Sequence, residues 1–303
     1  MSDSSANDLD EGQLAVALAE DAPDDAVKKT LGFGFWLCAA WLLAIVLVAI
    51  LAPVLPIEDP TENRVGPLKE GPSWSHWFGT DNAGRDVFSR AVWGARVSLV
   101  VGAFAITFGL VVGGSLGMIA GYLKGVVDQV ISFIFFALLS FPALILAILI
   151  VTTFDRTLQL VSLTLGILSV APVGRLARAQ TLVFAEREFV DAAKVIGAKN
   201  GRIVTRELLP NVLIPMGALG LLGMGVAMVA EGGLAFLGLS VAGDDAGQLS
   251  WGKLINESTK GRALSDFPHV SLSIILVMFA TILALNFAGD RIRQYTDVRE
   301  TAF

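Results

Sequence analysis

Six apolar runs, each long enough to cross a bilayer, restrict most strongly what this chain can fold into. They lie at about residues 31–55, 97–120, 128–152, 158–177, 212–231 and 270–288. A membrane-spanning helix needs about 20 predominantly apolar residues, and it satisfies its own backbone hydrogen bonds in lipid. Only 17% of the 303 residues are charged, against about 25% in a soluble domain. The sequence therefore predicts an all-α integral membrane protein with six transmembrane helices.

Basic residues beside these runs indicate the orientation. Lys28 and Lys29 precede the first run, which is too long for a signal-peptide core and has no small-residue cleavage site after it. Lys and Arg next to a span favour the cytoplasm. We therefore expect both termini and the 178–211 loop to be cytoplasmic, and the 56–96 and 233–269 loops to be extracytoplasmic. Several outer basic residues lie in the long 56–96 loop, where the charge rule is weak.

The net charge of −6 is unevenly distributed, which helps to divide the chain. Residues 1–25 contain eight acids and no Lys or Arg, so the remainder carries a net charge of +2. This composition is typical of a segment without a fold. The single cysteine, Cys38, excludes an intrachain disulfide. We divide the chain into an acidic cytoplasmic tail (1–30), the first span with an extracytoplasmic loop (31–96), a core transmembrane domain (97–290) and a cytoplasmic C-terminal tail (291–303).

A polar interval from Glu188 to Pro215 separates the fourth and fifth runs and predicts a helix–turn–helix. Small and apolar side chains recur on one face of its first helix, at Phe189, Ala192, Ala193 and Ile196. Gly197 can supply the left-handed residue that ends this helix. We expect a second short helix, 202–209, to stop at Pro210, because proline cannot continue the hydrogen-bond ladder.

The same interval contains a motif with fixed spacing: Asp191, Ala192 and Ala193, then three residues, Gly197, eleven residues, and Leu209–Pro210. It resembles the EAA loop of ABC-importer permeases, whose form is E-A-A, three residues, Gly, eleven residues, L-P, with Asp here in place of the usual Glu. In that family the loop is a cytoplasmic coupling helix that docks into a groove on the ATPase subunit. The helical pattern alone supports an ordinary amphipathic hairpin equally well, and the fixed spacing favours the coupling role.

The outer loops carry a more specific resemblance. His76 to Leu99 reads HWFGTDNAGRDVFSRAVWGARVSL, and Glu231 to Val241 reads EGGLAFLGLSV, followed by SWG at 250–252. These segments are similar to the dipeptide/oligopeptide/nickel permease family, in its C-type subunit, and the similarity covers roughly residues 76–300. It implies the type I permease fold, a second homologous permease subunit, two ATPase subunits and an extracytoplasmic binding protein. The acidic tail and the DDAGQL interval match nothing in that family.

The second run contains a ridge of small residues at every fourth position: Ala105, Gly109, Gly113, Gly117 and Gly121. Because lipid gives little drive to bury apolar area, small residues that permit close backbone approach mark a helix contact. The partner is either another span of this chain or a second subunit. Pro142 and Pro172 predict kinks in the third and fourth spans.

Several patterns resemble nucleotide-binding, metal-binding or catalytic motifs, but each lacks a residue or context that the motif requires. Residues 247–254, GQLSWGKL, nearly form a phosphate-binding loop, but Leu254 stands where the magnesium-binding hydroxyl belongs and no strand precedes it. His76 and His269 stand alone, without a Cys/His cluster for a metal. Asp81 and Asp86 bracket a turn, which favours a salt-bridged scaffold over an acid–base pair. No nucleophile elbow is present, so no catalytic residue is proposed.

Ionisable groups at membrane depth are costly and often mark a pathway. We expect Glu231 near the outer interface, where it reaches the headgroups or lines a vestibule. Arg175 and Arg178 end the fourth run, and we expect them to anchor the cytoplasmic interface. Asn286, near the inner end of the sixth run, is expected to join helices rather than bind a ligand.

The sequence is thus interpreted as one permease subunit of an ATP-driven importer of di- or oligopeptides, in a bacterial or archaeal cytoplasmic membrane. It is expected to bind no cofactor, metal or nucleic acid, since ATP and magnesium would be used by partner ATPases. A second permease, an extracytoplasmic binding protein and membrane lipid complete the expected partners. The alternative is an ATP-independent carrier or channel, which would more often place charges in mid-span.

Overall fold

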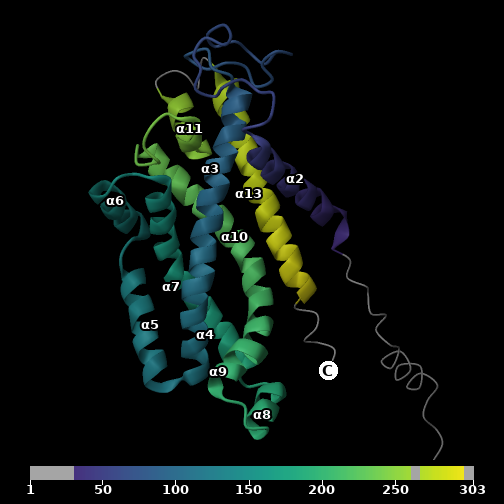
Figure 1. Ribbon diagram of the computed structural model, residues 1–303, viewed down its shortest axis with the longest axis vertical. Coiled ribbons are helices and arrows are strands. Elements are labelled where there is room, and N and C mark those ends of the chain that lie inside the picture. Colours follow the sequence, from purple (N-terminus) through teal and green to yellow (C-terminus); the bar gives the residue numbers. More distant parts are fainter. Residues whose placement is uncertain (1–30, 261–266, 297–303) are drawn as a thin grey trace, which may run out of the picture.

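The computed structural model describes residues 31–260 and 267–296, and regular structure there is helical apart from one isolated bridge. Five helices are long and apolar enough to cross a membrane, and the bent pair α5–α6 makes a sixth. Most run along the long axis of the molecule, with α8 at one end and α11 at the other (Figure 1). We refer to these as the α8 end and the α11 end. The predicted all-α fold with six spans is confirmed.

The elements follow the chain in simple order. The first three spans are α2 (Gly32–Leu51), a continuous helix of α3 (Val87–Phe108), η1 (Gly109–Gly113) and α4 (Gly114–Leu123), and the pair α5 (Gly125–Ser140) and α6 (Ala143–Thr153). The last three are α7 (Leu158–Phe184), a continuous helix of α9 (Asn200–Arg202), η2 (Ile203–Leu208) and α10 (Leu209–Phe236), and α13 (Pro268–Thr296). The shorter helices are α8 (Glu188–Val195), η3 (Ala246–Gln248) and α11 (Trp251–Thr259). Segments η1 and η2 are π-helical, and η3 is a 3₁₀ turn.

Several predicted span boundaries were wrong because a helix continues beyond its apolar run, and the second and fourth spans show this most clearly. The second span begins at Val87, ten residues inside the predicted outer loop. Asp86 explains that start, since its side chain accepts a hydrogen bond from the backbone N–H of Ser89 (2.6 Å) and caps the helix. The fourth span continues to Phe184 and passes through Pro172. The predicted kink at Pro142 is confirmed, because α5 and α6 meet there at 81°.

The predicted stop at Pro210 was also wrong. Pro210 is the second residue of α10, and the helix runs without a break from Asn200 to Phe236. Proline is tolerated near a helix start, where its missing N–H is not needed. Here a wide π-helical turn precedes it, in which the N–H of Leu209 donates to the carbonyl of Val204, five residues earlier. The second helix of the hairpin and the fifth span are therefore one continuous helix rather than two.

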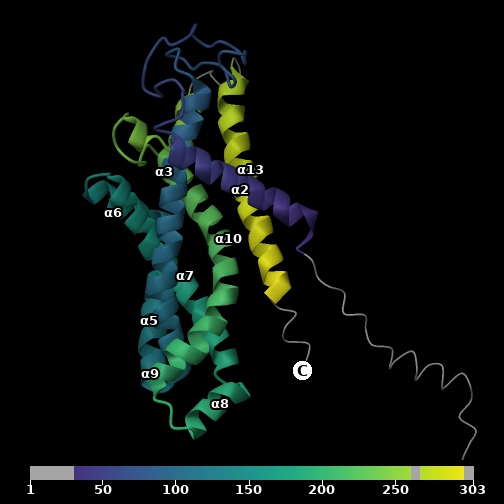
Figure 2. The ribbon, with the colours of Figure 1, turned by 45° about the vertical axis from the view of Figure 1, so that its right-hand side comes forward.

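The α11 end packs around a buried tryptophan. Trp251 is 0% exposed, and its indole Nε1–H donates to the carbonyl of Ala91 (2.8 Å), while its backbone N–H donates to Ser98 Oγ (3.0 Å). These bonds fix α11 against α3. At the other side of the bundle, α2 crosses α13 at an angle (Figure 2), where Trp41 Nε1–H donates to Thr281 Oγ1 (3.2 Å).

The glycine ridge lies against α7 of the same chain. A Cβ at Gly113 would collide with the carbonyl of Val170, one at Gly117 with the carbonyl of Gly174, and one at Gly121 would lie 2.9 Å from the carbonyl of Arg178. A Cβ at Gly109 would meet the side chain of Ser169. The contacts at Gly113, Gly117 and Gly121 are with backbone, which cannot move aside as a flexible side chain does. The helix that packs on the ridge is therefore a span of this chain and not one of a second subunit.

The π-helical segment η1 keeps this ridge in line. Four residues of an α-helix turn through about 400°, so a ridge at every fourth position drifts around the helix. A wider π turn rotates less per residue and reverses part of the drift. Segment η1 covers Gly109–Gly113, in the middle of the ridge. We infer that this turn lets glycines spread over thirteen residues, from Gly109 to Gly121, face one neighbour.

Gly117→Ala should destabilise the protein by about 1–3 kcal/mol, as overpacking does, because the added Cβ meets a carbonyl of α7. Gly114→Ala is the matched control, since nothing lies within 4 Å of its Cβ position. The control should be neutral or gain up to about 1 kcal/mol from helix propensity. Thermal unfolding of the two purified variants measures the difference. Equal melting temperatures would show that the ridge is not a close contact.

Candidate functional site

The hairpin at the α8 end rests on a small hydrophobic cluster. Val190 of α8 and Ile203 and Leu208 of η2 are each 0% exposed and pack together. Phe184 and Tyr122 surround them, so the cluster joins the hairpin to α7 and α4. The sequence pattern did not single out Val190, which lies off the predicted face. Because both helices of the hairpin share this cluster, they are positioned as one unit.

Gly197 ends α8 as predicted. Its φ is +83°, in the left-handed region. The N–H of Ala198 donates to the carbonyl of Ala193 (3.0 Å), and the N–H of Gly197 donates to that of Lys194 (2.9 Å). This pair of bonds is the Schellman motif, which satisfies the last carbonyls of a helix. A side chain at Gly197 would be strained by this φ, although the space around it is open.

The end of α8 projects apolar surface away from the protein. Val195 is 88% exposed and Ile196 is 85% exposed, and Ala192 lies on the same open side. Thus the face predicted from Phe189, Ala192 and Ile196 is the outward one, with only Ala193 half-buried. An apolar patch at the end of a polar hairpin fits a surface that a partner covers.

The remaining residues of the predicted loop lie beside this apolar surface or at the start of α10. Asp191 is exposed and forms an ion pair with Lys194, with 2.9 Å between Oδ1 and Nζ, which raises the pKa of Lys194. Leu209 is half-buried and Pro210 exposed at the start of α10. The hairpin therefore presents small and apolar side chains in its centre, with charges beside them.

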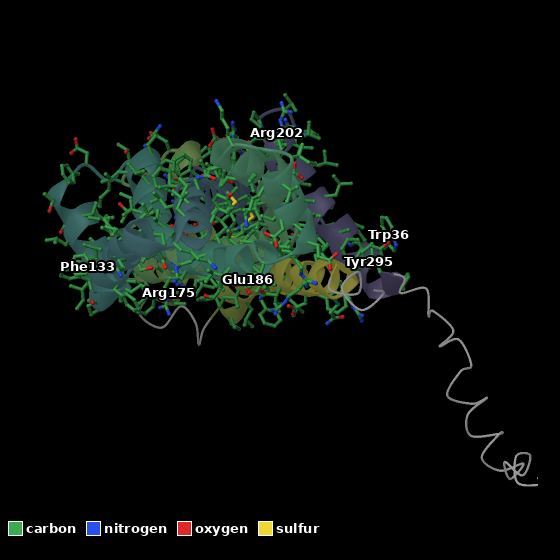
Figure 3. The ribbon with its side chains drawn as sticks, turned by 90° about the horizontal axis from the view of Figure 1, so that it is seen from below. Trp36, Phe133, Arg175, Glu186, Arg202 and Tyr295 are labelled. Atoms are coloured by element: carbon green, nitrogen blue, oxygen red, sulfur yellow. The ribbon has the colours of Figure 1, made fainter. Side chains whose placement is uncertain are left out.

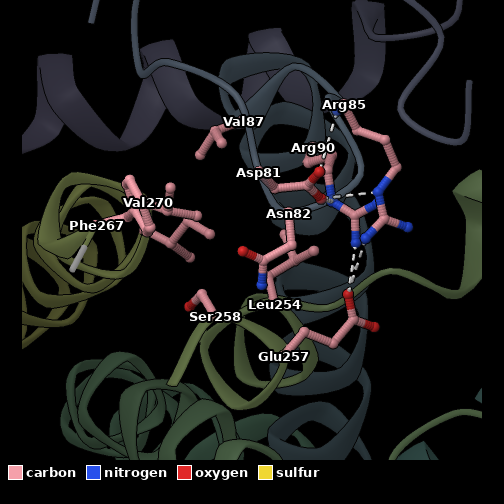
Figure 4. A pocket seen from close by; sticks show the side chains of 11 residues that line it. Asp81, Asn82, Arg85, Val87, Arg90, Leu254, Glu257, Ser258, Phe267 and Val270 are labelled. Atoms are coloured by element: carbon pink, nitrogen blue, oxygen red, sulfur yellow. Dashed lines mark hydrogen bonds and ion pairs between the residues drawn. The ribbon is translucent and has the colours of Figure 1, made fainter. Parts of the chain in front are cut away.

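A network of four charges joins the two outer loops at the α11 end (Figure 4). Arg85 Nε lies 2.7 Å from Asp81 Oδ2, and Arg90 Nη2 lies 2.7 Å from Glu257 Oε2. Arg90 is 3% exposed and also donates to the carbonyl of Pro60 (3.1 Å). The network borders a cavity of about 50 Å³. It ties the 52–86 loop and α3 to α11.

The predicted scaffold role of Asp81 and Asp86 is confirmed. Asp81 pairs with Arg85, and Asp86 Oδ1 lies 3.1 Å from His76 Nδ1. His269 Nε2 lies 3.1 Å from the carbonyl of Glu70, so the two histidines serve the same loop without sharing a site. Among the described residues, no three His, Cys, Asp or Glu side chains gather as metal ligands.

The segment that nearly forms a phosphate-binding loop is the start of α11. Ser250 caps this helix by accepting the N–H of Lys253 (3.1 Å). Lys253 Nζ donates to the carbonyl of Gly243 and pairs with Asp244 Oδ1 (3.0 Å), which lowers the pKa of Asp244. The lysine is thus engaged in holding the preceding loop.

The structure places Glu231 differently from the sequence-based prediction. Its side chain does not reach the headgroups or an open vestibule, because α10 continues to Phe236 and α11 covers it, leaving it 0% exposed. Oε1 accepts hydrogen bonds from the hydroxyls of Ser240 (2.8 Å) and Ser250 (2.6 Å). Oε2 lies buried against Gly252 without a hydrogen-bond partner. The carboxyl group therefore holds α10, the following loop and α11 together.

The two arginines of α7 lie deeper than expected, because α7 extends to Phe184. Arg178 Nε and Nη2 donate to the two carboxylate oxygens of Asp128 on α5 (2.5 and 2.6 Å). Arg175, one turn further into the span, is exposed. Neither residue ends the helix, which continues to Phe184, and their expected anchoring at the cytoplasmic interface stays a prediction. Asn286 lies half-buried on α13, beside Gly225 of α10.

These features define a class of protein. Six candidate spans, a hairpin that projects from one end, and two loops joined by a charge network at the other are the features expected of an importer permease. The sequence matches the family described as the binding-protein-dependent transport system inner membrane component over residues 113–301, and the chain belongs to that family. It is therefore a multi-pass inner-membrane permease that works with ATPase and substrate-binding partners. This assignment fits the importer interpretation and not the ATP-independent carrier or channel.

Several known proteins resemble this chain. It is 40% identical to the dipeptide transport system permease protein DppC of Alkalihalophilus pseudofirmus, over 84% of this chain and 83% of that protein. It is 33% identical to the glutathione transport system permease protein GsiD of Pectobacterium atrosepticum, over 86% of this chain and 85% of that one. The inward-facing MetNI methionine ABC transporter has a chain of the same fold, with a TM-score of 0.53 at 18% identity, over 67% of this chain and 94% of that one.

Glu231→Ala should lower the free energy of unfolding by about 1–3 kcal/mol, because it leaves buried hydroxyls without their acceptor. Glu231→Gln keeps an acceptor oxygen in the same place and should remain close to wild type. Glu188→Ala, at an exposed position of α8, is the control and should have no effect. Thermal unfolding in detergent tests all three. A glutamine variant as unstable as the alanine variant would contradict this role.

Proposed function

We propose that this chain is one of two homologous permease subunits of a peptide importer and that its hairpin couples ATP hydrolysis to transport. The observation that carries this proposal is the surface of α8. Ile196 and Val195 are almost fully exposed, yet the helix beneath them is fixed by Val190. An apolar patch on a rigid base suits docking into a groove on another protein, because little order is lost on binding.

Small peptides are the proposed cargo. DppC and GsiD, each over 80% covered by this chain, are named for dipeptide and glutathione transport. Dipeptides and glutathione are both short peptides with free carboxylates. Because this chain is similar to both permeases in length and sequence, a short peptide is the cargo we propose for it. A second, homologous permease subunit would complete the path, and an extracytoplasmic binding protein would deliver the peptide to the α11 end.

The energy source is assigned to separate ATPase subunits. Lys253, the residue nearest to a phosphate-binding lysine, is bonded to Gly243 and Asp244. We therefore expect the purified chain to bind neither ATP nor magnesium, and no direct cofactor is proposed. In this arrangement the α8 end and both termini face the cytoplasm, where ATP is available.

Substitutions in the hairpin should separate ATP hydrolysis from transport. In Ala193→Trp the large ring cannot fit beside the Val190 cluster or in a preformed groove. In Gly197→Glu the φ of +83° is strained and a charge enters the docking surface. We expect normal membrane insertion, at least a tenfold loss of dipeptide uptake, and ATPase activity that is lost or no longer responds to the loaded binding protein. Proteoliposomes that contain the whole complex allow both measurements.

Gly201→Ala is the matched control for this experiment. Gly201 also lies in the hairpin, but its φ is not positive and its Cβ position is open. Uptake in this variant should equal that of wild type. If Ala193→Trp and Gly197→Glu also keep normal uptake and normal stimulated ATPase activity, the hairpin is not the coupling element.

The orientation is tested by thiol labelling in sealed cells. Cys38→Ser removes the native thiol, and single cysteines are placed at Ser75, Asn200 and Asp244, which are all exposed. A membrane-impermeant reagent outside the membrane should modify positions 75 and 244 and spare position 200, because Asn200 lies at the α8 end. Modification of position 200 in intact cells, without modification of the other two, would reverse the orientation.

A further inference from the structure

Arg175 carries a charge in the middle third of α7, where a membrane helix rarely places one. Helix α7 runs from Leu158 to Phe184, and Arg175 lies four residues from its midpoint. At a rise of 1.5 Å per residue, its Cα is about 6 Å from the middle of the helix. A hydrocarbon core about 30 Å thick and centred on this helix would extend about 15 Å to each side of the midpoint and enclose this position.

The guanidinium group does not extend toward the nearer interface. It lies over the ring of Phe136 on α5, with 5.3 Å between Cζ and the ring centroid. Lys124 and Glu186, whose side chains approach to 3.4 Å, mark the level of the α8 end. Phe136 and Arg175 lie twelve and eleven residues from them, so both are about 16–18 Å above that level. The charge thus remains level with its own Cα.

Arg175 is also the exposed one of two arginines on adjacent turns. Arg178 forms two hydrogen bonds to the carboxylate of Asp128. In the described part of the chain, Arg175 has no hydrogen bond or ion pair, and its contact is the aromatic ring. Viewed from below, Arg175, Phe133 and Glu186 lie along one edge of the molecule (Figure 3). Exposing an unpaired guanidinium to lipid costs much free energy, so we expect this face of α7 not to contact lipid.

The surroundings of Arg175 fit a ligand with one carboxylate and variable apolar parts. Phe133 is 72% exposed and Phe136 is 58% exposed, which gives an aromatic wall beside a single cation. Ligand sites typically combine apolar walls with a few placed polar groups. A guanidinium presents a fork of donors that matches a carboxylate. Peptides of any sequence share their terminal carboxylate, so one arginine serves them all.

We propose that Arg175, supported by the ring of Phe136, lines the translocation pathway and binds the carboxylate of the passing peptide. This inference rests on the proposed function in peptide import. A cation–aromatic contact leaves the N–H donors of the guanidinium free, so it holds the group ready without competing with a ligand for hydrogen bonds. Release remains fast, as conduction requires.

The test uses the complete complex in proteoliposomes, with dialanine as the transported probe. Arg175→Gln should reduce dialanine uptake at least tenfold, and Arg175→Lys should retain part of it. Arg96→Gln is the matched control, since Arg96 is also exposed and lies over an aromatic ring, Trp93, near the α11 end of α3. Its uptake should equal that of wild type. Complex stability and basal ATPase activity should be unchanged in all three.

Chemical modification then identifies the need for a positive charge. In the Cys38→Ser, Arg175→Cys complex, a water-soluble aminoethyl thiosulfonate should react and restore uptake several-fold, while a sulfonatoethyl reagent should not. Transported dialanine should slow the reaction. The inference would be overturned if position 175 were not labelled, if uptake were equal after both reagents, or if dialanine gave no protection. It would also be overturned if the Arg175→Gln complex fell apart, because that result would indicate that Arg175 pairs with an acid of the partner permease. A wild-type complex that imports neither dialanine nor glutathione would overturn the proposed function and this inference with it.

Discussion

The close backbone contact between the glycine ridge and α7 is the interaction on which the rest of the bundle depends. Helices in lipid gain little from apolar burial, so they associate where small residues bring their backbones together. Here α4 contacts α7 at Gly117 and Gly174, with carbonyl oxygens in the gap. On its other side, Gly174 receives the ring of Phe135 from α5. One helix of small residues thereby fixes two neighbours, and the Asp128–Arg178 pair forms where α5 and α7 are held.

Features that depend on local chemistry were predictable from the sequence. The length of the apolar runs predicted the spans, and the spacing of the glycines predicted a close helix contact. Gly197 predicted the end of α8, where its φ is left-handed. The bend at Pro142 and the scaffold role of Asp81 belong to the same group. Each follows from a few adjacent residues, with no reference to distant parts of the chain.

Features that depend on distant packing were not predictable. Pro210 normally ends a helix, and only the preceding π turn allows α10 to continue. Glu231 is buried because α11, twenty residues later in the chain, folds back over it. Arg175 marked the end of an apolar run, yet the helix continued into a segment of mixed polarity because α4 and α5 pack beside it. In each case a tertiary contact outweighed the local pattern.

The continuity of α10 has a mechanical consequence for coupling. The helix from Asn200 to Phe236 has 37 residues, which at 1.5 Å each span about 55 Å. At its start, Ile203 and Leu208 hold the hairpin against Val190. Near its other end, Glu231 accepts a hydrogen bond from Ser250, the N-cap residue of α11. The helix is continuous between these contacts, with Pro215 inside it. We therefore expect a shift of the hairpin to be transmitted along α10 to α11 and the charge network attached to it, so that the two ends of the permease respond together.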